Sequence, residues 1–209
     1  MAEFELLARS AIAPIEPIAH WGGWEVSGAN STGPLRLADL TPLAKVGIRS
    51  AAQGGLADAL GVAFGRARRD SHGSLVIGSA PGEWLLLDAP GCAPALLERI
   101  AGLAGDSFTS AIDLTHARAL VRLTGDAAPE MLSKLCAIDL GDSTTPDGSA
   151  LRTAVADLVT DLIRDDDEGQ RSYWLHCEWS SGQYLFDVLR DAGAEFGIEV
   201  DGFRWVANG

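Results

Sequence analysis

The order of secondary-structure elements repeats along the chain, and this repeat constrains the fold more than any other feature. In the first half, the hydrophobic pattern predicts a strand over 44–50, a helix over 54–64, strands over 74–79 and 83–88, and a helix over 93–104. In the second half, it predicts a strand over 117–124, a helix over 127–136, strands over 153–164 and 172–178, and a helix over 182–196. This order predicts an α+β fold of two packed split β-α-β sandwiches, in which helices cover one face of each sheet.

The repeat is also visible in the residues, and it gives the expected domain boundaries. The runs 83–88 and 95–102 of the first half parallel the runs 173–178 and 184–193 of the second half. We expect an irregular N-terminal arm over 1–40, a first α+β subdomain over 41–108 and a second α+β subdomain over 109–209.

The expected arm combines chain-breaking residues with a large apolar content. Pro14, Pro17 and Pro34, together with several glycines, leave no sustained helical or strand period. The same segment carries Trp21, Trp24 and several aliphatic residues, more apolar surface than a free linker exposes. We therefore expect the arm to dock, either on its own domain or against another chain. Trp21 and Trp24 are the candidate residues for a partner interface.

Charge and hydropathy exclude several classes of partner. The 209 residues include 16 basic and 29 acidic side chains, and the formal net charge of −13 repels phosphate backbones and anionic lipids. Neither nucleic acid nor a membrane is an expected partner. Since the chain has no apolar run of the roughly 18–20 residues that span a bilayer, and no basic secretory start, we expect a cytoplasmic protein.

The sequence predicts no metal or cofactor site on this chain. Its three cysteines are odd in number and widely spaced, which favours reduced thiols over a disulfide framework. His176 and Cys177 point to opposite faces of a strand, so they do not ligate one ion together. The glycine-rich loops that hold dinucleotides and phosphates are missing. The acidic run 165–169 is expected to be a hairpin loop facing water, with calcium binding as the alternative.

A strand, a turn and an amphipathic helix are readable at the start of the second half. Alternating residues over 119–123 form a strand with two unequal faces, and Gly125 ends the strand. Asp126 is expected to cap the helix that follows. The apolar stripe of that helix consists of Ala128, Met131, Leu132, Leu135 and Cys136.

This unit resembles the folate-binding aminomethyltransferase superfamily. The resemblance is carried by Asp113-Leu-Thr-His116, by Leu123-Thr-Gly125 and by Asp139-Leu140. It is closest to one branch, the gamma subunits of heterotetrameric sarcosine oxidase, which share the small size, the run at 81–86 and the ending at 192–197. The resemblance covers roughly residues 40–200 and implies the folate-binding aminomethyltransferase fold.

The family's catalytic carboxylate has no counterpart here. Members that transfer a one-carbon unit carry a Gly-Gly and an Asp-Asp-Leu-Ile block, whose first carboxylate assists the chemistry at the folate nitrogen. In this chain Asp157-Leu158 replace the glycines, Thr160 stands in place of that carboxylate, and Asp161-Leu-Ile163 is kept. Since threonine does not accept a proton near neutral pH, no catalytic residue is predicted on this chain.

The resemblance implies a non-catalytic scaffold or assembly subunit of an oxidoreductase complex. Such a complex oxidatively demethylates sarcosine to glycine and transfers the one-carbon unit to tetrahydrofolate; a close variant is a dehydrogenase for another N-methyl amino acid. FAD, FMN, NAD and tetrahydrofolate would bind to other subunits. The implied partners are the alpha, beta and delta subunits, the alpha subunit above all.

The alternative hypothesis is a stand-alone folate-binding protein, either a one-carbon transferase or a folate-dependent assembly factor. It needs an anion-binding group for the glutamate tail and a carboxylate for the pterin, for which the weak candidates are Asp113, His116, Arg118 and Arg122. We expect Asp113 and His116 to meet across a short turn, as a pair that either fixes the chain or faces a ligand cleft. A third hypothesis is an α+β interaction module unrelated to oxidation.

Overall fold

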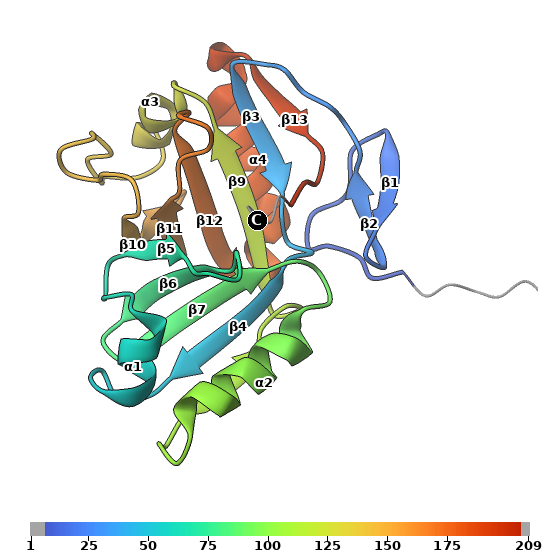
Figure 1. Cartoon of the computed structure of the whole chain (residues 1–209). Coiled ribbons are helices and arrows are strands. Elements are labelled where there is room, and N and C mark those ends of the chain that lie inside the picture. The colour runs from blue at the N-terminus through green and yellow to red at the C-terminus, as the bar shows by residue number, and fades with distance from the viewer. Residues whose placement is uncertain (1–6, 206–209) are drawn as a thin grey trace, which may run out of the picture.

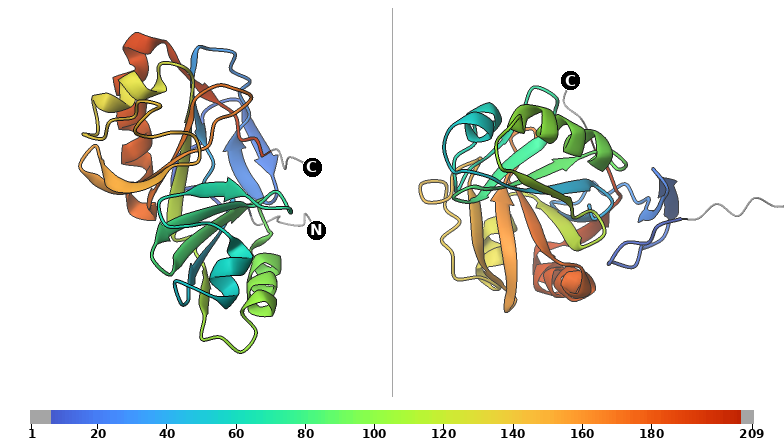
Figure 2. Two further views of the ribbon diagram at one scale, coloured as in Figure 1. Left: turned by 60° about the vertical axis from the view of Figure 1, so that its left-hand side comes forward. Right: turned by 90° about the horizontal axis from the view of Figure 1, so that it is seen from below.

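The computed structural model describes residues 7–205, which form four layers (Figures 1 and 2). One inner layer is a five-stranded antiparallel sheet. Its strands lie in the order β5 (Ala67–Arg69), β6 (Leu75–Ala80), β7 (Glu83–Asp88), β4 (Ala44–Arg49) and β8 (Ser110–Asp113).

The second inner layer is a six-stranded sheet built mostly from the second half of the chain. Its strands lie in the order β10 (Ala150–Val155), β11 (Leu158–Arg164), β12 (Ser172–Glu178), β9 (Arg118–Thr124), β3 (Leu35–Asp39) and β13 (Ile198–Asp201). All neighbours pair antiparallel except β13 and β3, which are parallel.

Helices form the two outer layers. They are α1 (Gly55–Leu60), α2 (Ala93–Ala104), α3 (Ala128–Ser133) and α4 (Gly182–Gly193), with short 3₁₀ turns at Trp179–Ser181 and Ala194–Phe196. The helices α1 and α2 cover the outer face of the five-stranded sheet, and α3 and α4 cover that of the six-stranded sheet (Figure 2). None of the described helices is long and apolar enough to cross a bilayer. The predicted α+β fold, with helices on one face of each sheet, is confirmed.

Strand alternation builds three separate cores. On β7, Trp84 and Leu86 pack under α1 and α2, while Leu85 and Leu87 face the other sheet. On β9, Val121 and its odd-numbered neighbours pack under α3 and α4, while Leu120 faces inward. The two sheets therefore share a central core between them, and each also has a core of its own beneath its helices.

Lys45 joins the two places where the chain crosses between the sheets. The chain crosses from β3 to β4 and returns from β8 to β9. The fully buried Nζ of Lys45 donates hydrogen bonds to the carbonyl oxygens of Thr41, Leu43 and Thr115, at 2.6, 2.9 and 3.2 Å. Burial lowers the pKa of Lys45 to about 7, although the charge of Asp39 acts in the opposite direction.

The segment predicted as one strand over 153–164 is a hairpin. The strands β10 and β11 pair with each other and turn at Ala156 and Asp157, whose φ angles are 49° and 64°. A tight turn with two positive φ angles usually contains glycine or asparagine. The prediction was wrong because neither turn residue is a glycine and apolar residues continue on both sides of the turn.

The segment predicted as an irregular arm contains three strands. β1 (Ile18–Trp21) and β2 (Trp24–Ser27) form a hairpin at the side of the molecule, and β3 lies inside the six-stranded sheet between β9 and β13 (Figure 1). Proline and glycine between these short strands hid their period. The division into an arm over 1–40 and two α+β subdomains over 41–108 and 109–209 stays a prediction.

The predicted strand-turn-helix unit is present, but its cap differs. The N-cap position of α3 is Ala127, without a side-chain hydrogen bond, so the predicted role of Asp126 as the cap was wrong. Gly125 has a φ of 144°, and a Cβ there would lie 2.2 Å from the carbonyl oxygen of Pro34. The turn therefore depends on a close backbone contact with the segment before β3. The predicted apolar stripe of α3 packs into the core of the six-stranded sheet.

Candidate functional site

A cleft, here called the inter-sheet cleft, opens between the two sheets. It has a volume of about 500 Å³ and is bounded by β4, β7 and β8 on one side and by β9 to β12 on the other. Leu85 and Leu114 contribute apolar walls, while Ile112 and Val159 line the cleft with side chains 57% and 72% exposed. The lining combines apolar side chains with polar and charged ones, and the volume lies within the usual range for small-molecule sites.

A buried carboxylate and imidazole pair line this cleft. Asp161 Oδ2 lies 3.1 Å from His176 Nδ1, and Asp161 Oδ1 accepts a hydrogen bond of 2.7 Å from Arg152 Nε. Burial opposes ionisation of Asp161, but the bonds from His176 and Arg152 outweigh it and lower the pKa of Asp161 to about 2. Asp161 is therefore a carboxylate at neutral pH.

His176 is neutral, because burial has a larger effect on its pKa than the hydrogen bond with Asp161 has. Burial lowers its pKa, and the charges of Arg118 and Lys45 act in the same direction, against the hydrogen bond that His176 donates to Asp161. With Asp161 ionised, the ring proton belongs on Nδ1, and Nε2 is a hydrogen-bond acceptor. Nε2 is buried and has no hydrogen-bond partner among the described residues.

The two candidate arginines of β9 lie in different places. Arg118 lines the inter-sheet cleft and pairs with Glu178 at 2.5 Å. Arg122 lies in a separate cavity of about 350 Å³, where its guanidinium packs 5.0 Å from the ring centroid of Trp174. Arg122 Nε also donates to Ser172 Oγ at 2.8 Å. The fold therefore does not bring the two arginines together around one ligand.

Asp113 and His116 make separate contacts. The Asp113 carboxylate accepts a hydrogen bond of 2.8 Å from the backbone N–H of Thr115 and so closes the turn after β8. The exposed ring of His116 stacks on Trp24, with centroids 4.8 Å apart and planes 13° from parallel. Each residue stabilises chain geometry: Asp113 fixes a turn, and His116 contacts the N-terminal hairpin.

Thr160 is sealed inside the protein. Its side chain is fully buried, and its hydroxyl donates a hydrogen bond of 3.0 Å to the carbonyl oxygen of Leu158. Thr160 lies on the helix-covered face of β11, whereas its neighbour Asp161 faces the inter-sheet cleft. The position at which the resemblance predicts a carboxylate in the transferases thus holds a buried hydroxyl that is hydrogen-bonded to the backbone.

The two tryptophans proposed for a partner interface differ in exposure. Trp24 is 4% exposed and belongs to the central core of its own chain. Trp21 is 41% exposed and touches only the edge of the body, where its ring centroid lies 5.0 Å from that of Phe203. The side chain available to a partner is therefore Trp21.

The acidic loop between β11 and β12 is paired, not solvated as we expected. Asp165 pairs with Arg69 at 3.0 Å, Asp167 pairs with Arg122 at 3.2 Å, and Asp166 pairs with Arg164 at 2.9 Å. Arg69 and Arg122 are distant from the loop in sequence, so the local pattern could not predict their ion pairs with it. Among residues 7–205, no group of three or more His, Cys, Asp or Glu side chains is arranged to hold a metal ion.

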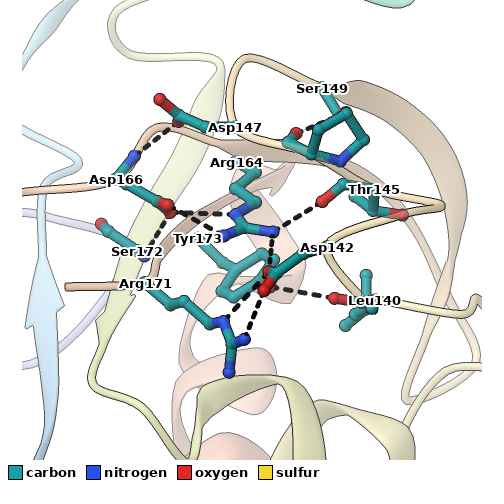
Figure 3. A network of polar contacts seen from close by, with 12 residues as sticks. Leu140, Asp142, Thr145, Asp147, Ser149, Arg164, Asp166, Arg171, Ser172 and Tyr173 are labelled. Carbon is teal, nitrogen blue, oxygen red and sulfur yellow. Dashed lines mark hydrogen bonds and ion pairs between the residues drawn. The ribbon is translucent and has the colours of Figure 1, made fainter. Parts of the chain in front are cut away.

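Arg164 connects this loop to the long segment after α3 (Figure 3). Its guanidinium makes two hydrogen bonds to Asp166, one to Asp142 and one to the carbonyl oxygen of Thr145. Arg171 binds the other side of Asp142. Four of the five N–H donors of Arg164 are thus used within the chain, which indicates a structural role.

Sequence reasoning missed the contacts that Asp161 makes with His176 and Arg152 in the cleft. Its signal was available once β10 and β11 are read as a hairpin, because Asp161 then lies opposite both Arg152 and His176. Reading 153–164 as one strand concealed that register.

Comparison with known proteins agrees with the predicted resemblance. No family model matches the chain. Two curated relatives are named sarcosine oxidase subunit gamma. One, from Corynebacterium sp. (strain P-1), is 27% identical and covers 95% of this chain and 98% of the relative. The other, from Corynebacterium sp. (strain U-96), is 29% identical and covers 82% of this chain and 84% of the relative.

Solved structures agree in fold. A chain of the heterotetrameric sarcosine oxidase from Corynebacterium sp. U-96 superposes with a TM-score of 0.68 at 26% identity, covering 80% of this chain and 88% of that chain. The glycine cleavage system aminomethyltransferase T from Bartonella henselae superposes with a TM-score of 0.67 at 14% identity, covering 88% of this chain and 55% of that chain. The latter similarity shows the fold alone. The predicted resemblance is thereby confirmed: along most of its length the chain is similar to proteins named sarcosine oxidase subunit gamma and to a chain of heterotetrameric sarcosine oxidase.

Proposed function

We propose that this chain is the gamma subunit of a heterotetrameric sarcosine oxidase and acts in it as a non-catalytic scaffold. The observation that carries the proposal is similarity along almost the whole length of both proteins, 95% of this chain and 98% of a relative named sarcosine oxidase subunit gamma. The complex oxidatively demethylates sarcosine to glycine, and the one-carbon unit passes to tetrahydrofolate.

The geometry of the candidate residues supports the non-catalytic part of the proposal. Thr160 is buried and hydrogen-bonded to the backbone, in place of the carboxylate that transferases of this fold use. Asp113 closes a turn, and Arg122 packs on Trp174 in a cavity apart from the inter-sheet cleft. These groups are engaged in holding the fold, as a scaffold requires.

The cofactors and partners follow from the same proposal. FAD, FMN, NAD and tetrahydrofolate bind to other subunits, and this chain contacts the alpha subunit in preference to the beta and delta subunits. The complex works in the cytoplasm. A net charge of −13 supports a protein partner over a nucleic acid or an anionic membrane.

The β1–β2 hairpin is the surface we assign to the partner. It stands at the side of the body (Figure 2). Its residues Ile18 and Trp21 are 38% and 41% exposed. Aromatic side chains of this kind are enriched in the centres of protein interfaces. Docking of the hairpin on the alpha subunit would bury both.

Removing and restoring the chain tests the proposal. Cells that make the complex without this chain should lose sarcosine-dependent oxygen uptake. Both the wild-type chain and Thr160→Val should restore it, because valine keeps the buried volume at Thr160 and supplies no acid or base. Full activity without the chain would refute its role as a subunit. Restored assembly without activity in Thr160→Val would refute the non-catalytic role.

A further inference from the structure

The inter-sheet cleft contains a buried hydrogen-bond acceptor, His176 Nε2, that a scaffold role does not explain. His176, only 3% exposed, lines the cleft, and its Nε2 has no hydrogen-bond partner among the described residues. A buried acceptor without a partner is unfavourable, and such atoms in native proteins are normally satisfied by protein, water or ligand. The cleft of about 500 Å³ beside it lies within the usual range for small ligands.

We propose that this cleft binds a small apolar molecule carrying one hydroxyl or neutral N–H group, which donates to His176 Nε2. The inference does not depend on the function proposed above, because it uses only the cleft and side chains of this chain and none of the partner subunits.

The requirement for a donor follows from the orientation of the ring. Asp161 Oδ2, at 3.1 Å, fixes the proton on Nδ1, and the second oxygen of Asp161 is taken by Arg152 at 2.7 Å. The imidazole therefore presents only a lone pair at Nε2. A ligand that lacks an O–H or N–H group leaves that lone pair unsatisfied.

The preference for a neutral donor follows from the nearby charges. The charges near His176 have both signs, since Asp161 is negative and Arg118 and Lys45 are positive, so no excess of either sign favours an ionic head group. The guanidinium groups that line the cleft are each paired already: Arg49 with Glu83, Arg118 with Glu178 and Arg152 with Asp161. No unpaired guanidinium among them calls for an anionic ligand.

The apolar body of the ligand follows from the walls. Leu85 and Leu114 face the cleft from the five-stranded sheet, and Ile112 and Val159 line it with largely exposed side chains. A ring or a branched alkyl group that covers Ile112 and Val159 removes this apolar surface from water.

Three matched probes test the inference on the full-length chain labelled with ¹⁵N-histidine at pH 7. Benzyl alcohol has a ring and a hydroxyl, toluene lacks the donor, and benzylammonium carries a charge. We expect benzyl alcohol to cause a saturable upfield shift of the unprotonated Nε2 resonance of His176. Toluene should bind about tenfold more weakly, which is the usual effect of losing one hydrogen bond. Benzylammonium keeps a donor but brings a charge that no unpaired group of the cleft compensates, so it should also bind more weakly than benzyl alcohol. A linear shift that does not saturate, or equal affinity for the three probes, would overturn the proposal.

Two substitutions on exposed positions complete the test without disturbing the core. Val159→Trp narrows the cleft and should weaken benzyl alcohol binding about tenfold. Leu103→Trp, on a 43% exposed residue outside the cleft lining, is the matched control and should leave binding unchanged. Unchanged binding in Val159→Trp would place the probe elsewhere and overturn the assignment.

Discussion

The buried Nζ of Lys45 forms hydrogen bonds with both connections between the sheets, from β3 to β4 and from β8 to β9. Replacing it by methionine keeps the volume but leaves the carbonyl oxygens of Thr41, Leu43 and Thr115 without their donor. Because each buried acceptor that loses its partner is unfavourable, we expect Lys45→Met to lower the free energy of unfolding by about 3 kcal/mol. Urea denaturation followed by circular dichroism measures this loss.

The other lysine of the chain is the natural control. Lys134 is 42% exposed and binds Glu195 and a backbone carbonyl at the surface. Lys134→Met should change the unfolding free energy by less than about 1 kcal/mol. Equal effects of the two substitutions would contradict the role assigned to Lys45.

Asp161 makes the free energy of unfolding decrease at acid pH. Hydrogen bonds from His176 and Arg152 outweigh the effect of burial and lower its pKa from 3.8 to about 2, so the folded chain holds this proton less tightly than the unfolded chain. The contribution to stability, about 2 kcal/mol, is complete above the unfolded pKa and is lost as the pH falls through the folded pKa. The difference in unfolding free energy between the wild type and Asp161→Asn should therefore shrink between about pH 4 and pH 2.

A surface carboxylate provides the comparison for Asp161. Asp187 pairs with Arg190 on an exposed face of α4. Asp187→Asn should change stability by less than about 0.5 kcal/mol over the same pH range. A difference between wild type and Asp161→Asn that stays constant down to pH 2 would show that the carboxylate charge does not stabilise the fold.

At the scale of elements, the β1–β2 hairpin separates stability from assembly. Trp24 is buried against the body and stacks on His116, so Trp24→Ala should lower the unfolding free energy by about 3 kcal/mol. Trp21 is largely at the surface, so Trp21→Ala should cost less than about 1 kcal/mol and instead reduce recovery of partner subunits.

Denaturation and co-purification measure the two effects of the hairpin separately. Tyr184→Ala, which removes a 51% exposed aromatic side chain from α4, is the control for assembly. If Trp21→Ala assembles like the wild type, the hairpin is not the partner surface.

Much of this arrangement was predictable from local sequence. The helix over 93–104 and the strand over 172–178 have the predicted bounds, because their apolar periods are long and uninterrupted. The strands β3 and β13 were not predicted, since each is short and pairs with the other across more than 150 positions of sequence. The site was only partly predictable: Arg118 lines the cleft, whereas His176 and Asp161 meet through a hairpin register that no glycine marked.

At the scale of the whole molecule, the described surface keeps large apolar side chains in contact with water. Phe108, Val159 and Phe64 are 93%, 72% and 63% exposed. Since a subunit separated from its partners exposes its interface to water, the full-length chain purified alone should self-associate as its concentration rises. Analytical ultracentrifugation measures this, and a monomer at every concentration would indicate an independent protein.

The central claim is that this chain works as one subunit of a flavin-containing assembly. The most direct measurement is to purify it from its native cell through an affinity tag and to record the native mass and the visible spectrum together. We predict one complex that contains this chain with larger partners, absorbs as a flavoprotein and bleaches when sarcosine is added. A colourless chain without partners would contradict the claim.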